Sequence, residues 1–253
     1  MVLGDAQQYS KAMACRSHGY SLFHPPLFED MQPGTVGYID ANGVWHGIAE
    51  LRDSRTLEYN DLGEFEGRLG CSRERKKLGP VESRSVKSNA ITLKSQADAV
   101  AMGLPVDVGG VVEYVTEASF GSVLMCDDEV EVECFSQRDN LVRWLEENHQ
   151  AILKLHRDVK DHGIYAVRTT TSAKHVSIRS WSGAGQKISV GYKLGASGIG
   201  NSTSEVSYYL ANHGVGWRQF HGEKRVVFFS GVKFRYNWLG KGREDRSEPA
   251  FSG

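Results

Sequence analysis

The chain lacks three features that would narrow its function at once: a long apolar run, an excess of one charge, and closely spaced cysteines. No stretch approaches the roughly 20 apolar residues that a membrane-spanning helix requires. Its 30 Lys and Arg residues against 31 Asp and Glu residues give a formal net charge of -1, which argues against a nucleic-acid binder, because such domains are usually strongly basic. A membrane crossing by strands stays open, since their alternating residues average out in hydropathy.

The cysteines are scattered along the chain, and none lies in a C-x-x-C pair: Cys15, Cys71, Cys126 and Cys134. This spacing argues against a metal site built from thiolates. The amino terminus lacks the basic start and apolar core of a secretory signal. We therefore expect a cytoplasmic protein whose thiols are reduced.

Motifs for catalysis are also missing. The sequence has no G-x-S-x-G nucleophile elbow, no phosphate-binding loop of the Walker A type and no metal-binding helix of the His/Glu type. The glycine-rich run 195–204 lacks the G-x-G-x-x-G order and indicates a flexible linker. We therefore expect no enzyme activity, no cofactor and no metal, which favours a binding, structural or membrane-active protein.

The first part of the chain predicts a helix and a hairpin. Apolar residues at helical spacing predict a short amphipathic helix over 5–18, either docked on the domain or in contact with lipid. In 35–51 two β-rich runs flank Asn42-Gly43, a pair typical of a tight hairpin turn. Trp45 beside this tip is either half-buried against a neighbour or an amphipathic anchor at a membrane interface.

The most concentrated basic run is 73–77, with the sequence Arg-Glu-Arg-Lys-Lys. It precedes Gly79-Pro80, so we expect a surface loop. Most such runs are merely solvated. The alternative is contact with anionic lipid, which contributes about 1 kcal/mol per basic residue near an acidic surface.

The remaining pattern predicts strands around one long helix. Residues 81–134 and 225–238 are β-prone, with 95–107 as a long adaptable connection, and an apolar stripe over 137–161 predicts the helix. In 187–194, Ile188, Val190, Tyr192 and Leu194 alternate with polar residues. Such alternation is typical of a half-buried sheet, and in a bilayer it would give one lipid face and one aqueous face.

Together these patterns predict one α+β domain over 1–239, with a twisted, mainly antiparallel sheet, a long packed helix and a short amino-terminal amphipathic helix. A charged, disordered tail over 240–253 is expected to follow.

The order of these elements resembles the amino-terminal, pore-forming domain of gasdermins. Two segments carry the resemblance: 38–51, which is similar to the early hairpin of the family, and 162–169 followed by 174–178, which is similar to its helix-to-strand step. The short fungal gasdermin-like proteins, which regulate cell death in allorecognition, are the relatives that the resemblance indicates.

The resemblance implies a lipid-activated pore former, and in contrast to the mammalian members of the family we expect no carboxy-terminal inhibitory domain. It implies self-association, anionic phospholipid membranes and an allelic homologous partner as binding partners, and a move from the cytoplasm to the plasma membrane upon oligomerisation. It places lipid contacts at Lys11, Arg16, Val44, Trp45, Arg73, Arg75, Lys76 and Lys77. It makes the stretches around 86–125 and 164–194 the regions that refold into membrane-crossing hairpins, including Val111, Tyr114, Val123, Val176, Ile178, Ile188, Val190, Tyr192 and Leu194.

A second hypothesis is a soluble β-rich ligand-binding module of lectin type. It would use exposed tryptophans for stacking on a sugar, and the candidates are Trp45, Trp181, Trp217 and Trp238. An exposed indole at each position is the feature that this hypothesis requires.

Overall fold

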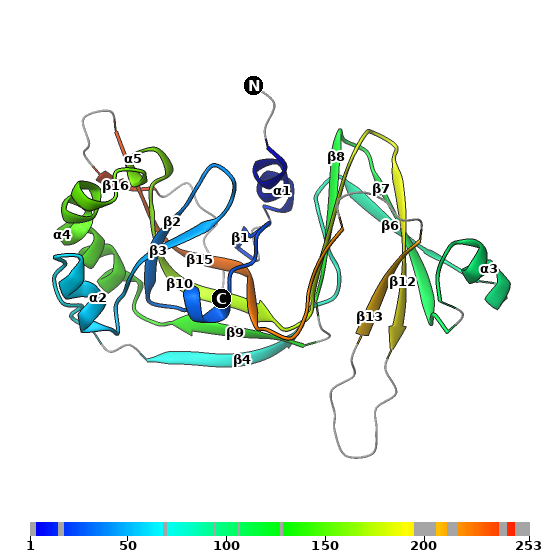
Figure 1. Ribbon diagram of the computed structural model, residues 1–253, viewed down its shortest axis with the longest axis horizontal. Coiled ribbons are helices and arrows are strands. Elements are labelled where there is room, and N and C mark those ends of the chain that lie inside the picture. The colour runs from blue at the N-terminus through cyan, green and yellow to red at the C-terminus, as the bar shows by residue number, and fades with distance from the viewer. Residues whose placement is uncertain are drawn as a thin grey trace, which may run out of the picture.

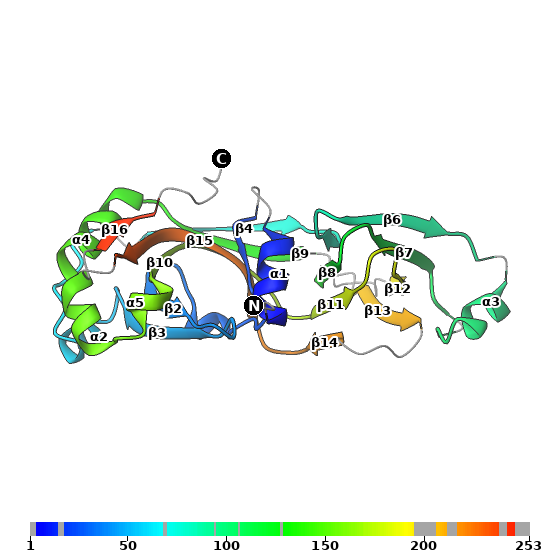
Figure 2. The same ribbon diagram turned by 90° about the horizontal axis from the view of Figure 1, so that it is seen from above.

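The long helix and the strand hairpins lie at opposite ends of an elongated molecule (Figures 1 and 2). The computed structural model describes residues 4–14, 18–67, 70–93, 95–105, 107–126, 129–194, 206–211, 217–237 and 242–245. Helices and antiparallel sheets occur together in this part of the chain. The predicted α+β class with a mainly antiparallel sheet is therefore confirmed.

An eight-stranded antiparallel sheet forms the body. Its main path runs β1-β15-β10-β2-β3, β9 and β4 extend it from β10, and β16 pairs with β15. The strands are β1 (Tyr20–Ser21), β2 (Thr35–Ile39), β3 (Trp45–Glu50), β4 (Cys71–Lys77), β9 (Glu129–Phe135), β10 (Ile164–Ala173), β15 (Arg225–Tyr236) and β16 (Gly242–Glu244).

Two four-stranded antiparallel sheets form the other end. One has the order β14-β11-β8-β5 and the other β13-β12-β7-β6. Their strands are β5 (Val81–Glu82), β6 (Val86–Ile91), β7 (Gly110–Thr116), β8 (Phe120–Cys126), β11 (Val176–Ser182), β12 (Lys187–Leu194), β13 (Val206–Ala211) and β14 (Trp217–Phe220). Through described residues the chain passes from one sheet to the other at 83–85, 117–119 and 183–186, and it passes again between β13 and β14.

The long helix α4 packs on the central sheet. Its apolar stripe buries Leu141, Leu145 and Ile152 in one cluster with Ile164 and Phe234 of the sheet. Burying one such side chain stabilises the fold by about 1.5–3 kcal/mol. The helices are α1 (Asp5–Met13), α2 (Ser54–Tyr59), α3 (Gln96–Ala101), α4 (Arg138–Leu155) and α5 (Val159–His162), with a 3-10 turn at Phe28–Asp30.

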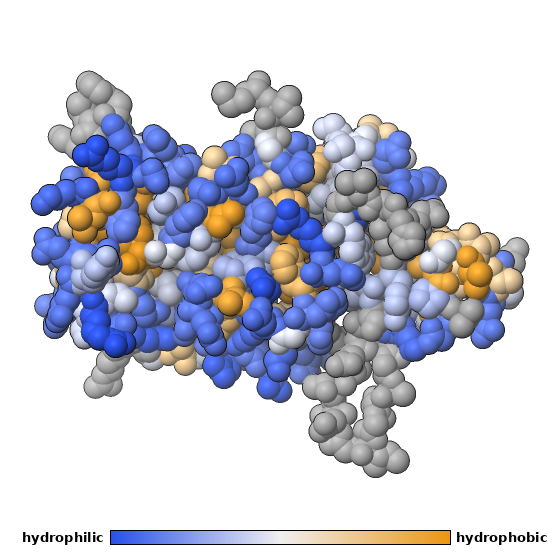
Figure 3. All heavy atoms as spheres, in the orientation of Figure 1, coloured by the Kyte–Doolittle hydropathy of each residue, from blue (hydrophilic) through white to orange (hydrophobic). Residues whose placement is uncertain are grey.

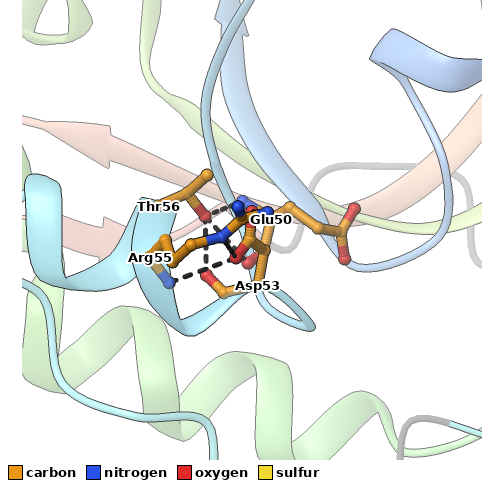
Figure 4. A network of polar contacts seen from close by, with 4 residues as sticks. All are labelled: Glu50, Asp53, Arg55 and Thr56. Atoms are coloured by element: carbon orange, nitrogen blue, oxygen red, sulfur yellow. Dashed lines mark hydrogen bonds and ion pairs between the residues drawn. The ribbon is translucent and has the colours of Figure 1, made fainter.

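Helix α2 begins at a polar cap next to the end of β3 (Figure 4). The Asp53 carboxylate accepts a hydrogen bond from the Arg55 N–H at 3.1 Å, and the Thr56 hydroxyl lies 3.1 Å from both the N–H and the carbonyl oxygen of Glu50. Such caps satisfy backbone groups that a helix start leaves without an intrahelical partner. They fix the path of the chain between β3 and α2.

Several local predictions are corrected. Segment 73–77 is a strand and not a loop, because it is paired with β9. Segment 95–107 contains α3, which begins at a capping box of Ser95 and Asp98. The predicted helix over 137–161 is interrupted after Leu155, and the predicted disordered tail contains β16, paired with β15. The rest of that tail lies outside the described residues, as does the linker over 195–204.

Among the described residues, no helix has the length and apolar character that crossing a bilayer requires.

Candidate functional site

Helix α1 and the tip of the β2–β3 hairpin lie against each other. The Gln7 side-chain amide donates a hydrogen bond to the Ala41 carbonyl at 3.3 Å. A Cβ at Gly43 would lie only 2.7 Å from the Cβ of Ala6. The structure therefore brings together two predicted lipid contacts, the helix that carries Lys11 and the tip that carries Val44. Arg16 lies outside the described residues.

The hairpin tip is built around the Asp40 carboxylate. It accepts hydrogen bonds at 2.9 Å from the N–H groups of Asn42 and Val44, and lies 3.1 Å from His46 Nε2. Gly43 adopts a φ of 78° in the turn, where glycine is favoured. Burial opposes the charged form of Asp40, but the hydrogen bonds from Val44, His46 and Asn42 outweigh it and lower its pKa. The turn is therefore held in one conformation.

Trp45 is a core residue. Its side chain packs with Phe229, it is 8% exposed, and its indole N–H donates to the Asp30 carbonyl at 3.0 Å. The interpretation of Trp45 as an anchor at a membrane interface is therefore wrong for the folded chain, because the indole is already enclosed. Val44, at 37% exposed, is the apolar residue that the tip presents.

The basic run lies on β4 opposite acidic residues of β9. Arg73 pairs with Glu133 at 3.0 Å and Arg75 with Glu131 at 3.6 Å. Lys76 lies 3.2 Å from Glu74 on its own strand, and Lys77 faces Glu129 in the register. Much of the positive charge predicted to meet lipid is therefore neutralised within the sheet.

A cavity of about 640 Å³ opens between α1, the hairpin tip, α5 and β15. Three basic residues line it, Lys160, Lys233 and Arg235, together with the acidic Asp40 and Asp161. Sequence reasoning missed these basic residues. The alternation of Lys233 and Arg235 with aromatic residues at the end of the apolar strand is the signal that could have indicated them.

Lys233 is the buried member of this group. Its ammonium donates a hydrogen bond to the Tyr165 hydroxyl and lies 4.5 Å from the centre of that ring. Burial, with a contribution from Arg235, lowers the pKa of Lys233 to about 8. The lysine therefore titrates much closer to neutral pH than an exposed lysine.

Most of the proposed membrane-crossing residues are buried in the folded chain. Val176 and Ile178 pack under α1, Tyr114, Val123 and Val190 lie between the two four-stranded sheets with Ile188 partly buried against them, and Val111 lies in the cluster beside α3. Tyr192 borders a cavity of about 440 Å³ beside α3. Leu194 pairs with Val206. The sheets therefore enclose Val111, Tyr114, Val123, Val176, Ile178 and Val190, and leave Ile188 and Tyr192 half-buried.

The inner strands of the two hairpins, β7–β8 and β11–β12, keep one pairing register across the bend between the two four-stranded sheets, which we call the corner. Ser182 pairs with Phe120 on one side of the corner, and Lys187 pairs with Val115 on the other. Segments of equal length, 116–119 and 183–186, separate the two pairs. If the corner were straightened, 110–126 and 176–192 would therefore form one uninterrupted antiparallel ladder without any slip.

In the straightened ladder all the charged side chains would lie on one face. Alternate residues of a strand share a face. In segments 110–126 and 176–192, no even-numbered residue is charged. All the charged residues are odd-numbered: Glu113, Glu117, Arg179 and Lys187. Of the proposed membrane-crossing residues only Val111 and Val123 are odd-numbered. The bend conceals this two-sided character, because even-numbered Tyr114 and Val190 pack there against odd-numbered Val123 and Trp181.

No protein-family model matches the chain, and no curated protein matches its sequence. Its fold is similar to two gasdermins. The gasdermin A3 membrane pore aligns at 10% identity and a TM-score of 0.34, over 96% of this chain and 93% of the other. A bacterial gasdermin from Bradyrhizobium tropiciagri aligns at 10% identity and a TM-score of 0.30, over 92% and 88%. A likeness at such scores carries no argument about what this chain does.

The tryptophans do not fit a lectin-type site. Trp45 and Trp181 are each only 8% exposed, and Trp217 is partly buried against the cluster between the two sheets. Trp238 lies outside the described residues. Stacking on a sugar requires an open ring face, which neither buried indole offers.

An apolar patch is exposed at the far end of the hairpin sheets, over α3 (Figure 3). Val100 of this helix is 54% exposed.

Within the described part of the chain, no three His, Cys, Asp or Glu side chains gather as a metal site would require.

Proposed function

We propose that this chain is a membrane pore-forming cell-death effector. In this proposal the bent protein waits in the cytoplasm, binds anionic lipid at the plasma membrane, and oligomerises. Its two hairpins, 81–126 and 176–220, then straighten and cross the bilayer as strands of a barrel shared by several copies. The second hairpin begins at Val176 and not at Ile164, because β10 belongs to the central sheet.

The observation that carries the proposal is the sorting of charge between odd and even positions. A bilayer-crossing strand needs one apolar face and one aqueous face over roughly 9–11 residues. Segments 110–126 and 176–192 both exceed that length, and their continuous register keeps the faces aligned through the corner. A soluble sheet that stays bent has no need for this agreement between its two arms.

Oligomerisation follows from the free edges. Among the described strands, the outer strands of the hairpins, β6 and β13, each pair with one neighbour in the sheet, β7 and β12. In a bilayer every backbone N–H and carbonyl must be paired. One straightened chain would leave both outer edges unpaired, whereas a ring of copies pairs the first hairpin of one with the second hairpin of the next.

The lipid-binding surface in this proposal combines α1, the hairpin tip and the cavity between them. Lys11 and Val44 contribute from the elements that touch each other, and Lys160 contributes positive charge from the cavity wall, where Arg235 is already paired with Asp245. Lys76 and Lys77 remain candidates for long-range attraction. Arg73 and Arg75 are proposed only as sheet residues, because they face Glu133 and Glu131.

Activation by an allelic partner in fungal allorecognition is the most specific part of the proposal. It rests on the resemblance of the two sequence segments to the family. Co-assembly of two allelic forms would pair the outer edges that a single chain leaves unpaired.

Dye release from liposomes tests the function. Vesicles containing phosphatidylserine or cardiolipin should leak in the presence of the protein, alone or mixed with an allelic homologue, and vesicles of phosphatidylcholine alone should leak much less. No release under any of these conditions, while the protein remains folded, would contradict the proposal.

A further inference from the structure

Buried hydroxyl groups gather at the corner where the hairpins bend. Thr116 and Ser122 are both 0% exposed, and Ser83 is 2% exposed. We propose that these hydroxyls, with Ser85, form a latch that holds the hairpins bent, and that opening this latch limits the rate of membrane insertion. The claim about the rate of insertion rests on the proposed pore function, whereas the latch itself is a property of the chain in water.

Thr116 lies at the centre of the latch. Its hydroxyl accepts a hydrogen bond from the Ala118 N–H at 3.3 Å, and its single proton has acceptors at the Phe120 carbonyl (3.2 Å), the Ala118 carbonyl (3.4 Å) and the Ser85 hydroxyl (3.3 Å). Ser85 itself donates to the Phe120 carbonyl at 3.0 Å. One side chain thus ties the end of β7 to the start of β8.

A second group of hydroxyls secures the neighbouring strands. The Ser83 hydroxyl accepts from the Ser122 N–H at 3.1 Å. The Ser122 hydroxyl lies 2.9 Å from that of Ser180 and donates to the Arg179 carbonyl at 2.8 Å. On the same corner the Trp181 indole N–H donates to the Gln186 carbonyl at 3.2 Å. The bend is therefore bound by side chains on three passes of the chain.

These bonds favour the bend over a straight strand. Ser and Thr hydroxyls that bond to nearby backbone groups compete with the ladder of a sheet. Here Thr116 occupies the Ala118 N–H, a group within the segment that a straight ladder would run through. Thr116 is even-numbered, so straightening would move it to the uncharged face and away from the Ala118 N–H and the Phe120 carbonyl, whereas Ser122 and Ser180 would stay opposite each other in the ladder. The hydrogen bonds of Thr116 and Ser85 therefore stabilise the bent form and are lost in the straight one.

Thr116→Val removes the hydroxyl and keeps the shape of the side chain. The matched control is Thr170→Val in β10 of the central sheet, because Thr170 is also 0% exposed but its hydroxyl has no hydrogen-bond partner. Ser85→Ala is the milder second variant if Thr116→Val does not fold. Hydrogen exchange of each full chain in water, followed by mass spectrometry, reports on the latch without any membrane.

We expect Thr116→Val to speed hydrogen exchange in peptides over 81–126 and 176–194 by about three- to tenfold, because the loss of one buried hydrogen bond has an effect of this size. Exchange in α4 and β15 should be unchanged. Thr170→Val should leave the hairpin peptides unchanged. Unchanged exchange at the corner, or an equal increase in α4 and β15, would overturn the latch.

Dye release separates the two halves of the inference. A shorter lag for Thr116→Val than for the unmodified chain would support the latch as the limiting step, and an unchanged lag despite faster exchange would overturn that step. Faster exchange with no release by any variant would support the latch in water and contradict the pore function.

Discussion

The Arg73 guanidinium lies 3.0 Å from the Glu133 carboxylate across the ladder between β4 and β9. Glu133 is almost enclosed and also lies 3.0 Å from the Lys224 ammonium, which reaches Glu131 as well. The acidic strand is thus held between basic groups on two sides. A cluster that a linear sequence presents as positive is, in the fold, close to neutral.

Removing Arg73 is expected to cost stability rather than lipid binding alone. Arg73→Gln leaves the buried Glu133 carboxylate with one fewer partner and should lower the free energy of unfolding by about 1 kcal/mol. Lys76→Gln removes the same charge from an exposed position and should change it by less than about 0.5 kcal/mol. Urea denaturation of both variants checks this, and equal losses would contradict the assigned roles.

Lys224 is expected to govern the response to acid. Its hydrogen bond lowers the pKa of Glu131, so this carboxylate contributes stability above its unfolded pKa that is lost as the pH falls through the folded pKa. Lys224→Gln should cost about 1–3 kcal/mol at pH 7, and much less once the carboxylates are protonated. Unfolding measured at a series of pH values from 7 to 3 tests this; a constant difference between the two proteins would refute it.

Lys233 is expected to make the fold more stable in mild alkali. Its folded pKa of about 8 lies below the ordinary lysine pKa of 10.5, so between these values the unfolded chain binds more protons and stability rises with pH. The rise is at most about 1.4 kcal/mol per pH unit. Lys233→Met should abolish this contribution, and Lys154→Met, at an exposed position of α4, should retain it. Parallel pH profiles for Lys233→Met and the unmodified chain would contradict the burial argument.

Local patterns predicted the elements whose cause is local. Asn42-Gly43 predicted the hairpin because its turn needs a positive φ, and the stripe of Leu141, Leu145 and Ile152 predicted α4 because one face packs on the sheet. Segment 73–77 was mistaken for a loop, because its strand is stabilised by Glu131 and Glu133, far away in the sequence. The role of Trp45 was ambiguous for the same reason, because Phe229, against which its indole packs, is also far away in the sequence.

The two-sided character of the hairpins was only partly predictable. The alternation over 187–194 is visible in the sequence, and it placed Ile188, Val190 and Tyr192 on one side. That the same parity continues through 176–182 and in the partner strand depends on the register between distant segments, which only the paired strands reveal.

Two adjacent residues test the central claim that the hairpins straighten into the bilayer. Ala118 and Ser119 are both exposed at the corner, so a lysine at either position should leave the folded chain intact. In the straight ladder Ala118 lies midway along 110–126 on the apolar face, where a lysine costs about 2–4 kcal/mol at the bilayer midplane. Ser119 lies on the aqueous face.

The decisive measurement is dye release from anionic liposomes by Ala118→Lys and Ser119→Lys, after equal melting temperatures have been confirmed for the two variants. The account predicts that Ala118→Lys abolishes or strongly slows release while Ser119→Lys releases dye like the unmodified chain. Equal release by both variants, or loss confined to Ser119→Lys, would contradict it.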